Sequence, residues 1–417
     1  MKSPTSTMVS PYDGPQYSTI RRRIHGWSWQ SFPIGMGTGA VYVLLSALNP
    51  HPTWVTYIEI TFYILNMCLF SLNILMLSLQ FILFRRQFLR LSSDPVKGVF
   101  VPLSVLSFAT IFIGTINYAV PVGIINADGV YVMFWVYVVL AVIVSFPMLM
   151  VWFNQPHDVA TFTPAWAFLI FPLMLTGIIA LNALRVIQTS DPRALGILLI
   201  GYIFQGIVNP FLSCAVAGLL IGDNNLGVGL FMTFFYLAIY VLRIMTTGFM
   251  SGHQANGAFV ASGPPGFTAL ALINLGRSAK EILPRYNLVS PMAGEIFYAA
   301  SVMSALLLFG LAVFFFAFGA LPYWFKLHKS LHEILGCWAL TFPNVGWINT
   351  LMVLGKIFGI SGFDEWHLVM TVLVCATWIV LFSFTVVAFW KGEIFMSRNE
   401  DIHADISFTK PKNEEMA

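Results

Sequence analysis

Residues 258–276 read AFVASGPPGFTALALINLG, an uncharged stretch with two prolines, several glycines and a threonine near its start. Its length is close to the ~20 mostly apolar residues that a helix needs to cross a bilayer. Proline inside a membrane helix leaves one carbonyl unpaired and bends the helix, which is tolerated beside a water-filled path. The stretch therefore predicts a bent membrane-spanning helix that lines a polar passage.

Similar stretches recur along the chain. FPIGMGTG begins at Phe32, FPLMLTG at Phe171 and FPNVGW at Phe342, and VLSFAT at Val105 fits the pattern if Val105 replaces the proline. This internal repeat predicts five helical hairpins, with one longer step that contains an insertion near residues 206–226. The predicted kinks of the repeated helices lie at Pro33, Pro172, Pro265 and Pro343.

The composition supports a membrane protein. Apolar residues make up 58% of the 417 residues and charged residues only 9%, whereas soluble domains carry roughly 25% charged residues. Such a chain cannot cover a soluble surface, which excludes a cytosolic enzyme, a nucleic-acid-binding protein and a disordered regulator. The apolar runs are 31–48, 54–84, 99–121, 130–153, 164–187, 194–221, 228–250, 258–276, 294–325, 334–359 and 366–391.

The basic residues predict the orientation in the membrane. Lys and Arg cluster at 21–23, 85–97, 326–329 and 391–398, and they are absent from the loops at 49–53, 126–129 and 361–365. Basic loops stay in the cytoplasm, so both termini are expected there, in the polar tails 1–25 and 396–417. The transmembrane domain is expected at 26–395. Two cytoplasmic termini require an even number of crossings, so one of the eleven runs, within 194–250, is not a simple crossing.

The repeat also predicts two kinds of helix. Helices that carry Pro, Gly and Thr can approach closely and leave room for a lumen, so they should form an inner ring. Their hairpin partners, rich in Phe, Leu and Ile, should form an outer ring facing lipid. The sequence thus predicts an all-α membrane protein with ten transmembrane helices. The alternative is that Pro and Gly are simply common in membrane helices.

Four motifs carry a resemblance to a known family. They are WSW at Trp27, TPAW at Thr163, GPPGF with ALIN from Gly263, and FPNVG at Phe342. The chain resembles the tellurite-resistance/dicarboxylate transporter family, which includes slow anion channels and sulfite efflux pumps, and within it the fungal malic acid permeases. The similarity covers roughly residues 25–395. One segment, AGEIFY at Ala293, is closer to the sulfite pumps.

The resemblance implies a quasi-fivefold ring of ten helices around a central pore, in a homotrimer in the plasma membrane. It implies transport of malate and other C4-dicarboxylates, with a pore gated by a phenylalanine that corresponds to Phe342. The alternative role of Phe342 is core packing. The alternative function is efflux of sulfite or another small anion through the same fold.

Anion passage needs groups that replace the water around the anion. Arg185, Arg277 and Lys356 follow their prolines at similar distances, which predicts a basic vestibule at the non-cytoplasmic mouth. Alternatively, these cations complement helix dipoles and reach the interface. Hydroxyl and amide groups that could line the pore or bind substrate, each also explicable as helix packing, are Thr38, Thr110, Thr176, Asn274, Thr341 and Asn344. Protons are a candidate coupled ion, through Glu295, although an acid in a first helical turn also suits the helix dipole.

A membrane-bound enzyme is the remote alternative. His328, His332 and Glu333 have the spacing of a metal-binding box, but the other histidines are scattered and form no second box. We therefore expect no catalytic residues, no metal, no cofactor and no nucleic-acid partner.

Overall fold

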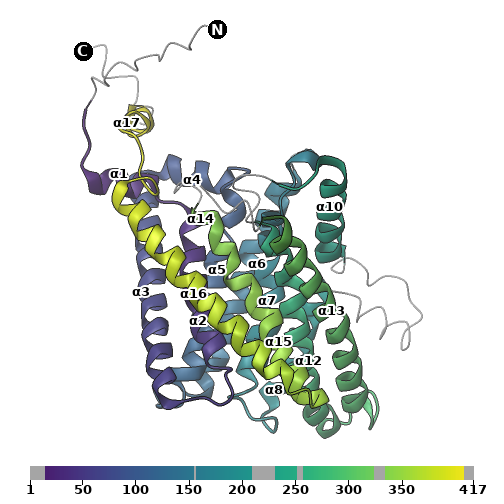
Figure 1. Cartoon of the computed structure of the whole chain (residues 1–417). Coiled ribbons are helices and arrows are strands. Elements are labelled where there is room, and N and C mark those ends of the chain that lie inside the picture. The colour runs from purple at the N-terminus through teal and green to yellow at the C-terminus, as the bar shows by residue number, and fades with distance from the viewer. Residues whose placement is uncertain (1–14, 155, 209–230, 251–256, 324–333, 408–417) are drawn as a thin grey trace.

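The computed structural model describes residues 15–154, 156–208, 231–250, 257–323 and 334–407. All regular secondary structure in these ranges is helical, and most helices run along one common direction (Figure 1). Six of the described helical segments are long and apolar enough to cross a membrane. The predicted all-α class is therefore confirmed, and the six long helical segments coincide with apolar runs of the sequence.

Five outer helices expose apolar side chains. Only 22% to 33% of the most apolar window is buried in four of them, α3, α6, α13 and α16. Exposed leucine, isoleucine, valine and phenylalanine side chains cover these helices, as expected for surfaces solvated by lipid rather than water. The outer helices are α3 (Thr53–Leu83), α6 (Ala127–Phe153), α8 (Pro192–Val208), α13 (Ala293–Tyr323) and α16 (Gly362–Lys391).

Five inner helices form the core. They are α2 (Phe32–Leu45), α5 (Leu103–Gly114), α7 (Phe171–Ala183), α12 (Gly263–Arg285) and α15 (Phe342–Phe358). In the spans that contain α5 and α12, 72% and 89% of the most apolar window is buried. Each inner helix contacts the outer helix that follows it. Each also contacts the next inner helix, and α15 contacts α2, so that the order of contacts closes.

A 3-10 turn precedes each inner helix. These turns are η1 (Trp29–Ser31), η2 (Gly98–Phe100), η5 (Pro164–Leu169), η6 (Gly257–Ser262) and η9 (Trp338–Leu340). The four prolines predicted to kink the inner helices lie in the first α-helical turn that follows. Proline is tolerated there because the first turn has no intrahelical acceptor for the missing N–H. Pro33, Pro172, Pro265 and Pro343 therefore begin regular helices rather than interrupt them.

The member of the repeat placed at Val105 also has a proline. Pro102 is the N-cap residue of α5, three residues before Val105. The sequence comparison missed it because the spacing between the proline and the following hydroxyl residues differs in this member. The five inner helices thus all begin at or next to a proline.

Glycines bring two inner helices into backbone contact. A Cβ atom added to Gly266 in α12 would lie 2.6 Å from the backbone nitrogen of Trp347 in α15. A Cβ atom added to Gly346 in α15 would lie 2.7 Å from the carbonyl carbon of Gly266. Both distances are shorter than any real contact of this kind, so only glycine fits at either position. The crossing of α12 and α15 is therefore fixed by a reciprocal pair of glycines.

The third hairpin departs from the pattern. In place of one long outer helix, the described chain has two helices of 17 residues, α8 and α10 (Phe231–Thr247). Helix α10 contacts α8, η5 and η4 (Val159–Thr161), and it stands at the upper end of the bundle (Figure 1). The insertion predicted near 206–226 lies mostly outside the described residues.

Both ends of the described chain meet at the upper end of the bundle. Helices α1 (Thr19–Gly26), α4 (Arg85–Ser93) and α17 (Asn399–Ser407) lie there together (Figure 1). The remaining elements are the π-helical turn η3 (Thr115–Ala119) and the short helix α14 (Ile334–Cys337). Since the two chain ends share one end of the bundle, the chain between them passes through it an even number of times.

Two basic residues of α1, Arg23 and His25, hold the C-terminal segment. Arg23 donates to the backbone oxygens of Phe389 and Ile394, at 2.5 and 3.1 Å, where α16 ends. Its guanidinium also lies 3.8 Å from the centre of the Phe389 ring. A cation at the C-terminal end of a helix satisfies free carbonyls and complements the helix dipole. The side chain of His25 continues this contact, since its ring nitrogens bond Ser397 Oγ at 2.7 Å and Asp405 Oδ2 at 3.0 Å.

The docking of α17 is expected to weaken in acid. Burial lowers the pKa of His25 from its ordinary value of 6.5, an effect that Arg90 reinforces and that Asp405 and Asp401 oppose only in part. Because the pKa of His25 is lower in the docked form than in the undocked form, the docked form gains stability at pH values above the ordinary pKa of histidine. This stability is lost as the pH falls through the lowered pKa of the docked form.

Hydrogen–deuterium exchange of α17, corrected for the intrinsic pH dependence of exchange, measures this effect. Protection should be lower at about pH 5 than at about pH 7.5, and His25→Gln should remove most of the difference. Equal protection at both pH values in the unmodified chain would contradict the expectation.

Candidate functional site

Two phenylalanine rings meet where α12 and α15 cross. Phe342 is the first residue of α15, Phe267 lies in the first turns of α12, and their rings stack with centroids 5.0 Å apart. The side chains are 3% and 2% exposed. The glycine crossing holds both helix starts close together, which places one ring from each inner helix in a single hydrophobic contact.

The sequence predicted Phe342 and missed Phe267. Two other Phe-Pro pairs occur at equivalent positions of the repeat, and their rings pack differently. Phe32 contacts Phe70 in the outer helix of its own hairpin, and Phe171 contacts Phe168 in the preceding turn η5. Of these three, Phe342 alone stacks on a ring from another inner helix. The signal for Phe267 was its place two residues after Pro265 in a related motif.

The predicted polar lining comes from all five inner spans. Several of these side chains already have partners from other helices. Thr38 Oγ1 accepts a hydrogen bond from Trp378 Nε1 at 3.1 Å, and Asn344 Oδ1 accepts from Trp347 Nε1 at 2.9 Å and from Ser262 Oγ at 3.2 Å. The bonds from Trp378 and Ser262 tie α2 and α15 to neighbouring elements, as the helix-packing alternative requires, whereas the bond from Trp347 lies within α15.

Thr110 belongs to a buried network. Its Oγ1 accepts from Asn66 Nδ2 at 2.9 Å, and its carbonyl accepts from the Tyr42 hydroxyl at 2.6 Å. The remaining three bond backbone carbonyls within their own segment. Thr176 donates to Pro172, Asn274 to Leu270 and Thr341 to Trp338. Their role in lining a pore stays a prediction.

The three predicted vestibule cations are exposed. Arg277 lies in the C-terminal half of α12, Lys356 in the last turn of α15, and Arg185 just beyond the end of α7. These ends of the inner helices lie away from the chain termini. Arg185 Nη1 donates to Asn117 Oδ1 at 3.0 Å and to Asn182 Oδ1 at 3.1 Å. Arg185 is therefore held at this end by amide groups and not by a carboxylate.

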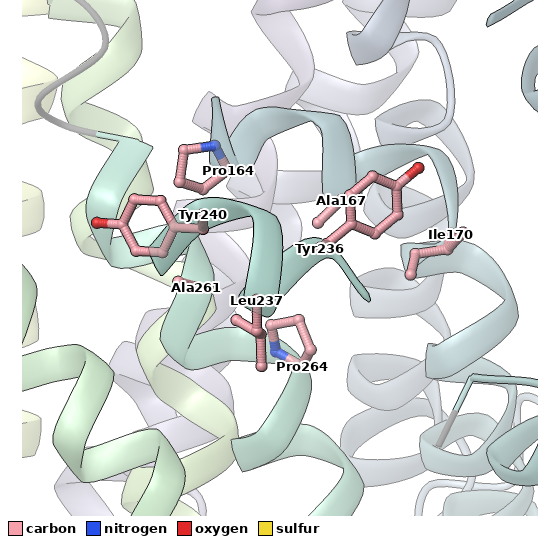
Figure 2. A pocket seen from close by; sticks show the side chains of 8 residues that line it. All are labelled: Pro164, Ala167, Ile170, Tyr236, Leu237, Tyr240, Ala261 and Pro264. Atoms are coloured by element: carbon pink, nitrogen blue, oxygen red, sulfur yellow. The ribbon is translucent and has the colours of Figure 1, made fainter. Parts of the chain in front are cut away.

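A small pocket lies at the opposite ends of α7 and α12. It is enclosed by η5, η6 and the first turn of α12, with α10 beside them, and prolines Pro164 and Pro264 line it (Figure 2). Tyr236 and Tyr240 of α10 also line it, and none of its lining residues is charged. An apolar pocket of this kind does not suit an anion, and we interpret it as the packing junction between α10 and the helix starts.

The remaining predicted groups are the histidine box and Glu295. The metal-binding box at His328, His332 and Glu333 lies outside the described residues. Within the described ranges, no three His, Cys, Asp or Glu side chains cluster as metal ligands. Glu295 is exposed and pairs with Lys280, with Oε1 and Nζ 3.1 Å apart.

An apolar outer shell, five inner helices that contact one another in closed order and a buried pair of phenylalanines are the main features of the described residues. Residues 26–222 and 208–386 match, in two overlapping segments, the SLAC1 family, described as voltage-dependent anion channel. The chain belongs to this anion-channel family. The family resemblance predicted from the sequence is confirmed, and the chain is a multi-pass membrane protein.

Curated relatives of the family carry transporter names. The chain is 26% identical to the malic acid transport protein of Schizosaccharomyces pombe, over 92% of this chain and 83% of the relative. It is 25% identical to a sulfite efflux pump of Arthroderma otae, over 89% of this chain and 92% of that relative. A putative malic acid transport protein of S. pombe is 24% identical, over 93% and 86% of the two chains. These names describe transport proteins.

Proposed function

We propose that this protein carries small organic anions, malate and related C4-dicarboxylates first among them, through a passage enclosed by α2, α5, α7, α12 and α15. The closed order of contacts among these five helices is the observation that carries the proposal. Ten crossings, one from each inner helix and one from each outer position, form a quasi-fivefold ring around the passage. The outer position of the third hairpin is shared by α8 and α10.

The chemistry of the passage fits an anion that must leave again. A dicarboxylate loses a large hydration energy when it enters a low-dielectric space. Hydroxyl and amide groups such as Thr176 and Asn274 replace part of that hydration without the strong binding that a buried cation would impose. The Phe267–Phe342 pair supplies a hydrophobic constriction that closes the passage.

The basic side chains support an orientation. Arg21, Arg22, Arg85 and Arg90 lie in or beside α1 and α4, at the end that carries both termini. By the positive-inside rule, this end is cytoplasmic and the ends of α7, α12 and α15 face the other side. We place the protein in the plasma membrane as a homotrimer, on the resemblance to the slow anion channels.

Sulfite is the second candidate substrate. The sulfite efflux pump and the malic acid transport protein are almost equally similar to the chain, at 25% and 26% identity. The segment Ala293–Tyr298 resembles the pumps, whereas GPPGF at Gly263 resembles the malate branch.

Competition in liposomes tests the two candidates. The purified full-length protein is reconstituted, and uptake of labelled malate is measured with unlabelled succinate or sulfite outside. Saturable malate uptake that succinate inhibits more strongly than sulfite is the expected result. Saturable uptake of labelled sulfite without malate uptake would assign the second function, and no uptake of either anion above protein-free liposomes would overturn both.

The vestibule gives a separate prediction. Replacing Arg185, Arg277 and Lys356 together by glutamine should raise the apparent KM for malate by about tenfold at low salt, because clustered cations concentrate anions at a pore mouth. The effect should shrink at high ionic strength, where the Debye length falls well below ~10 Å. Uptake kinetics at two salt concentrations measure this. A matched control replaces Lys391 and Arg398, which are exposed at the opposite end. An unchanged KM would contradict the vestibule and would favour the alternative, in which these cations complement the helix dipoles.

A further inference from the structure

Helix α3 contains one charged residue in 31, and that residue is buried. Glu59 lies in the second turn of α3 and is 2% exposed. It is enclosed between α3, the preceding loop and the end of the α5 span. An ionisable side chain inside a membrane segment is costly, so its partners indicate what it does.

Both carboxylate oxygens of Glu59 have partners. His51 Nε2 donates to Oε1 at 2.8 Å, and the Tyr118 hydroxyl donates to Oε2 at 3.2 Å. Among the described residues, His51 is the one basic side chain within ion-pair distance of Glu59, and its side chain is 32% exposed. Imidazole is the side-chain group best suited to exchange protons with neutral water. The buried acid is therefore connected to water by a group that carries protons.

Tyr118 connects the acid to the candidate anion pathway. It lies in the π-helical turn η3, at the end of the inner span that contains α5. Such turns occur often at functional sites, because they displace side chains from regular helical positions. The preceding residue, Asn117, accepts from Arg185 Nη1 at 3.0 Å. One turn of an inner helix thus contacts the buried acid through Tyr118 and a predicted vestibule cation through Asn117.

The surroundings contain few other titratable groups. Tyr42 of α2 and Tyr63 of α3 contact the Tyr118 ring, with centroids 6.0 and 5.5 Å away. Their hydroxyls are held by other helices, since Tyr42 donates to the carbonyl of Thr110 and Tyr63 bonds Thr115 Oγ1. The nearby cation is Arg185, whose Nη1 donates to Oδ1 of the adjacent Asn117 at 3.0 Å. Glu295, the acid suggested for proton coupling by the sequence, is exposed and paired with Lys280.

We propose that His51, Glu59 and Tyr118 form a proton-binding site that couples anion transport to proton entry from the side opposite the termini. This inference rests on the proposed transport function. A proton from water adds to His51 Nδ1, and the proton on Nε2 passes to Glu59 Oε1. The products are a neutral carboxylic acid and a neutral imidazole, so the site takes up one positive charge beside Arg185 and the entering anion.

Proton flux in the liposomes tests the site. Protein is reconstituted with a pH-sensitive dye inside, and malate or sulfite, whichever the protein transports, is applied outside in slightly acidic buffer. Internal acidification that requires the anion is expected for the unmodified protein and for Glu365→Gln, an exposed acid at the same end. Glu59→Gln should reduce acidification to the level of protein-free liposomes. Exchange of internal for external anion at equal pH, which needs no net proton movement, should remain.

The outcomes separate the two proposals. Anion uptake by the unmodified protein without acidification overturns the proton site and leaves the transport function intact, whereas no anion movement at all overturns the transport function. Acidification that persists in Glu59→Gln also overturns the site. If Glu59→Gln loses anion exchange as well, acidification is measured in His51→Gln at several external pH values. The His51 side chain is partly exposed, so its replacement should leave the fold intact. A flattened dependence of acidification on external pH supports the site, and a dependence identical to that of the unmodified protein overturns it.

Discussion

Replacing both Phe267 and Phe342 by alanine is expected to raise the anion leak through the protein by about tenfold or more, the factor that corresponds to ~1.4 kcal/mol of barrier. The two rings stack at 5.0 Å and are almost fully buried where α12 and α15 begin. Hydrophobic constrictions block ions by excluding water, so removing both rings should let water and anions enter. Phe342→Ala alone should have a smaller effect, because Phe267 remains.

Current across a planar bilayer measures the leak, with chloride or malate as the charge carrier. Phe32→Ala and Phe171→Ala are matched controls, since each removes the ring of a Phe-Pro pair that packs within its own hairpin or preceding turn. Those controls should lower thermal stability, because a buried Phe→Ala change typically costs about 3–5 kcal/mol, without adding leak. A leak equal to that of the unmodified protein in the folded double variant would show that the rings only pack the core.

Replacing Gly346 by alanine is expected to prevent stable folding or to lower the melting temperature strongly. The added methyl group would lie 2.7 Å from the carbonyl carbon of Gly266, which is backbone and cannot rotate away. Overpacking of a core contact typically costs about 1–3 kcal/mol, and more when backbone must shift. Gly266→Ala should behave similarly, since its methyl would lie 2.6 Å from the Trp347 nitrogen.

Gly310→Ala is the matched control for these variants. It lies in the outer helix α13, and a Cβ atom there meets nothing within 4 Å. Alanine is the better helix former, by about 0.8–1.0 kcal/mol, so this variant should be neutral or slightly more stable. Melting of the detergent-purified protein, followed by its tryptophan fluorescence, compares the three. Equal melting of Gly346→Ala and Gly310→Ala would show that α12 and α15 can separate without loss.

Separation of α12 and α15 should also disturb the phenylalanine pair. Gly266 directly precedes Phe267. A Cβ atom on Gly346 would press on the backbone of Phe267. If a Gly346→Ala protein can be purified, it should therefore leak as well as melt early. The two predictions test the same crossing from its packing and from its function.

Some site predictions could be made only in outline from the sequence. Thr38 and Asn344 were predicted as pore-lining because they are polar residues on apolar helices. The structure shows their partners, Trp378 for Thr38, and Trp347 and Ser262 for Asn344. Two of these partners are distant in the sequence, and no local pattern reports such a bond. The lining role of these residues remains a prediction.

Other features depend on contacts between segments that are far apart in the sequence. Glu59 lies early in α3, and its burial depends on Tyr118, which comes from another hairpin. The docking of α17 onto α1 joins His25 to Asp405 across most of the chain. The four prolines were expected inside bent helices, yet each lies in a first α-helical turn. The location of a helix start depends on the preceding 3-10 turn as well as on the proline.

The sequence by itself determined that this chain is helical, that it spans a membrane, that its hairpins repeat, and that it belongs to an anion-transport family. These conclusions follow from length, hydropathy and local motifs, because a bilayer requires long apolar helices wherever the chain crosses it. Tertiary structure alone decided which Phe-Pro ring meets a ring from another inner helix, that Gly266 and Gly346 set the crossing, and that Glu59 is buried with His51 and Tyr118. In a membrane, nearly every face of a helix is apolar, so hydropathy does not reveal which face meets a neighbour. That choice is made by close packing and by hydrogen bonds between segments far apart in the chain.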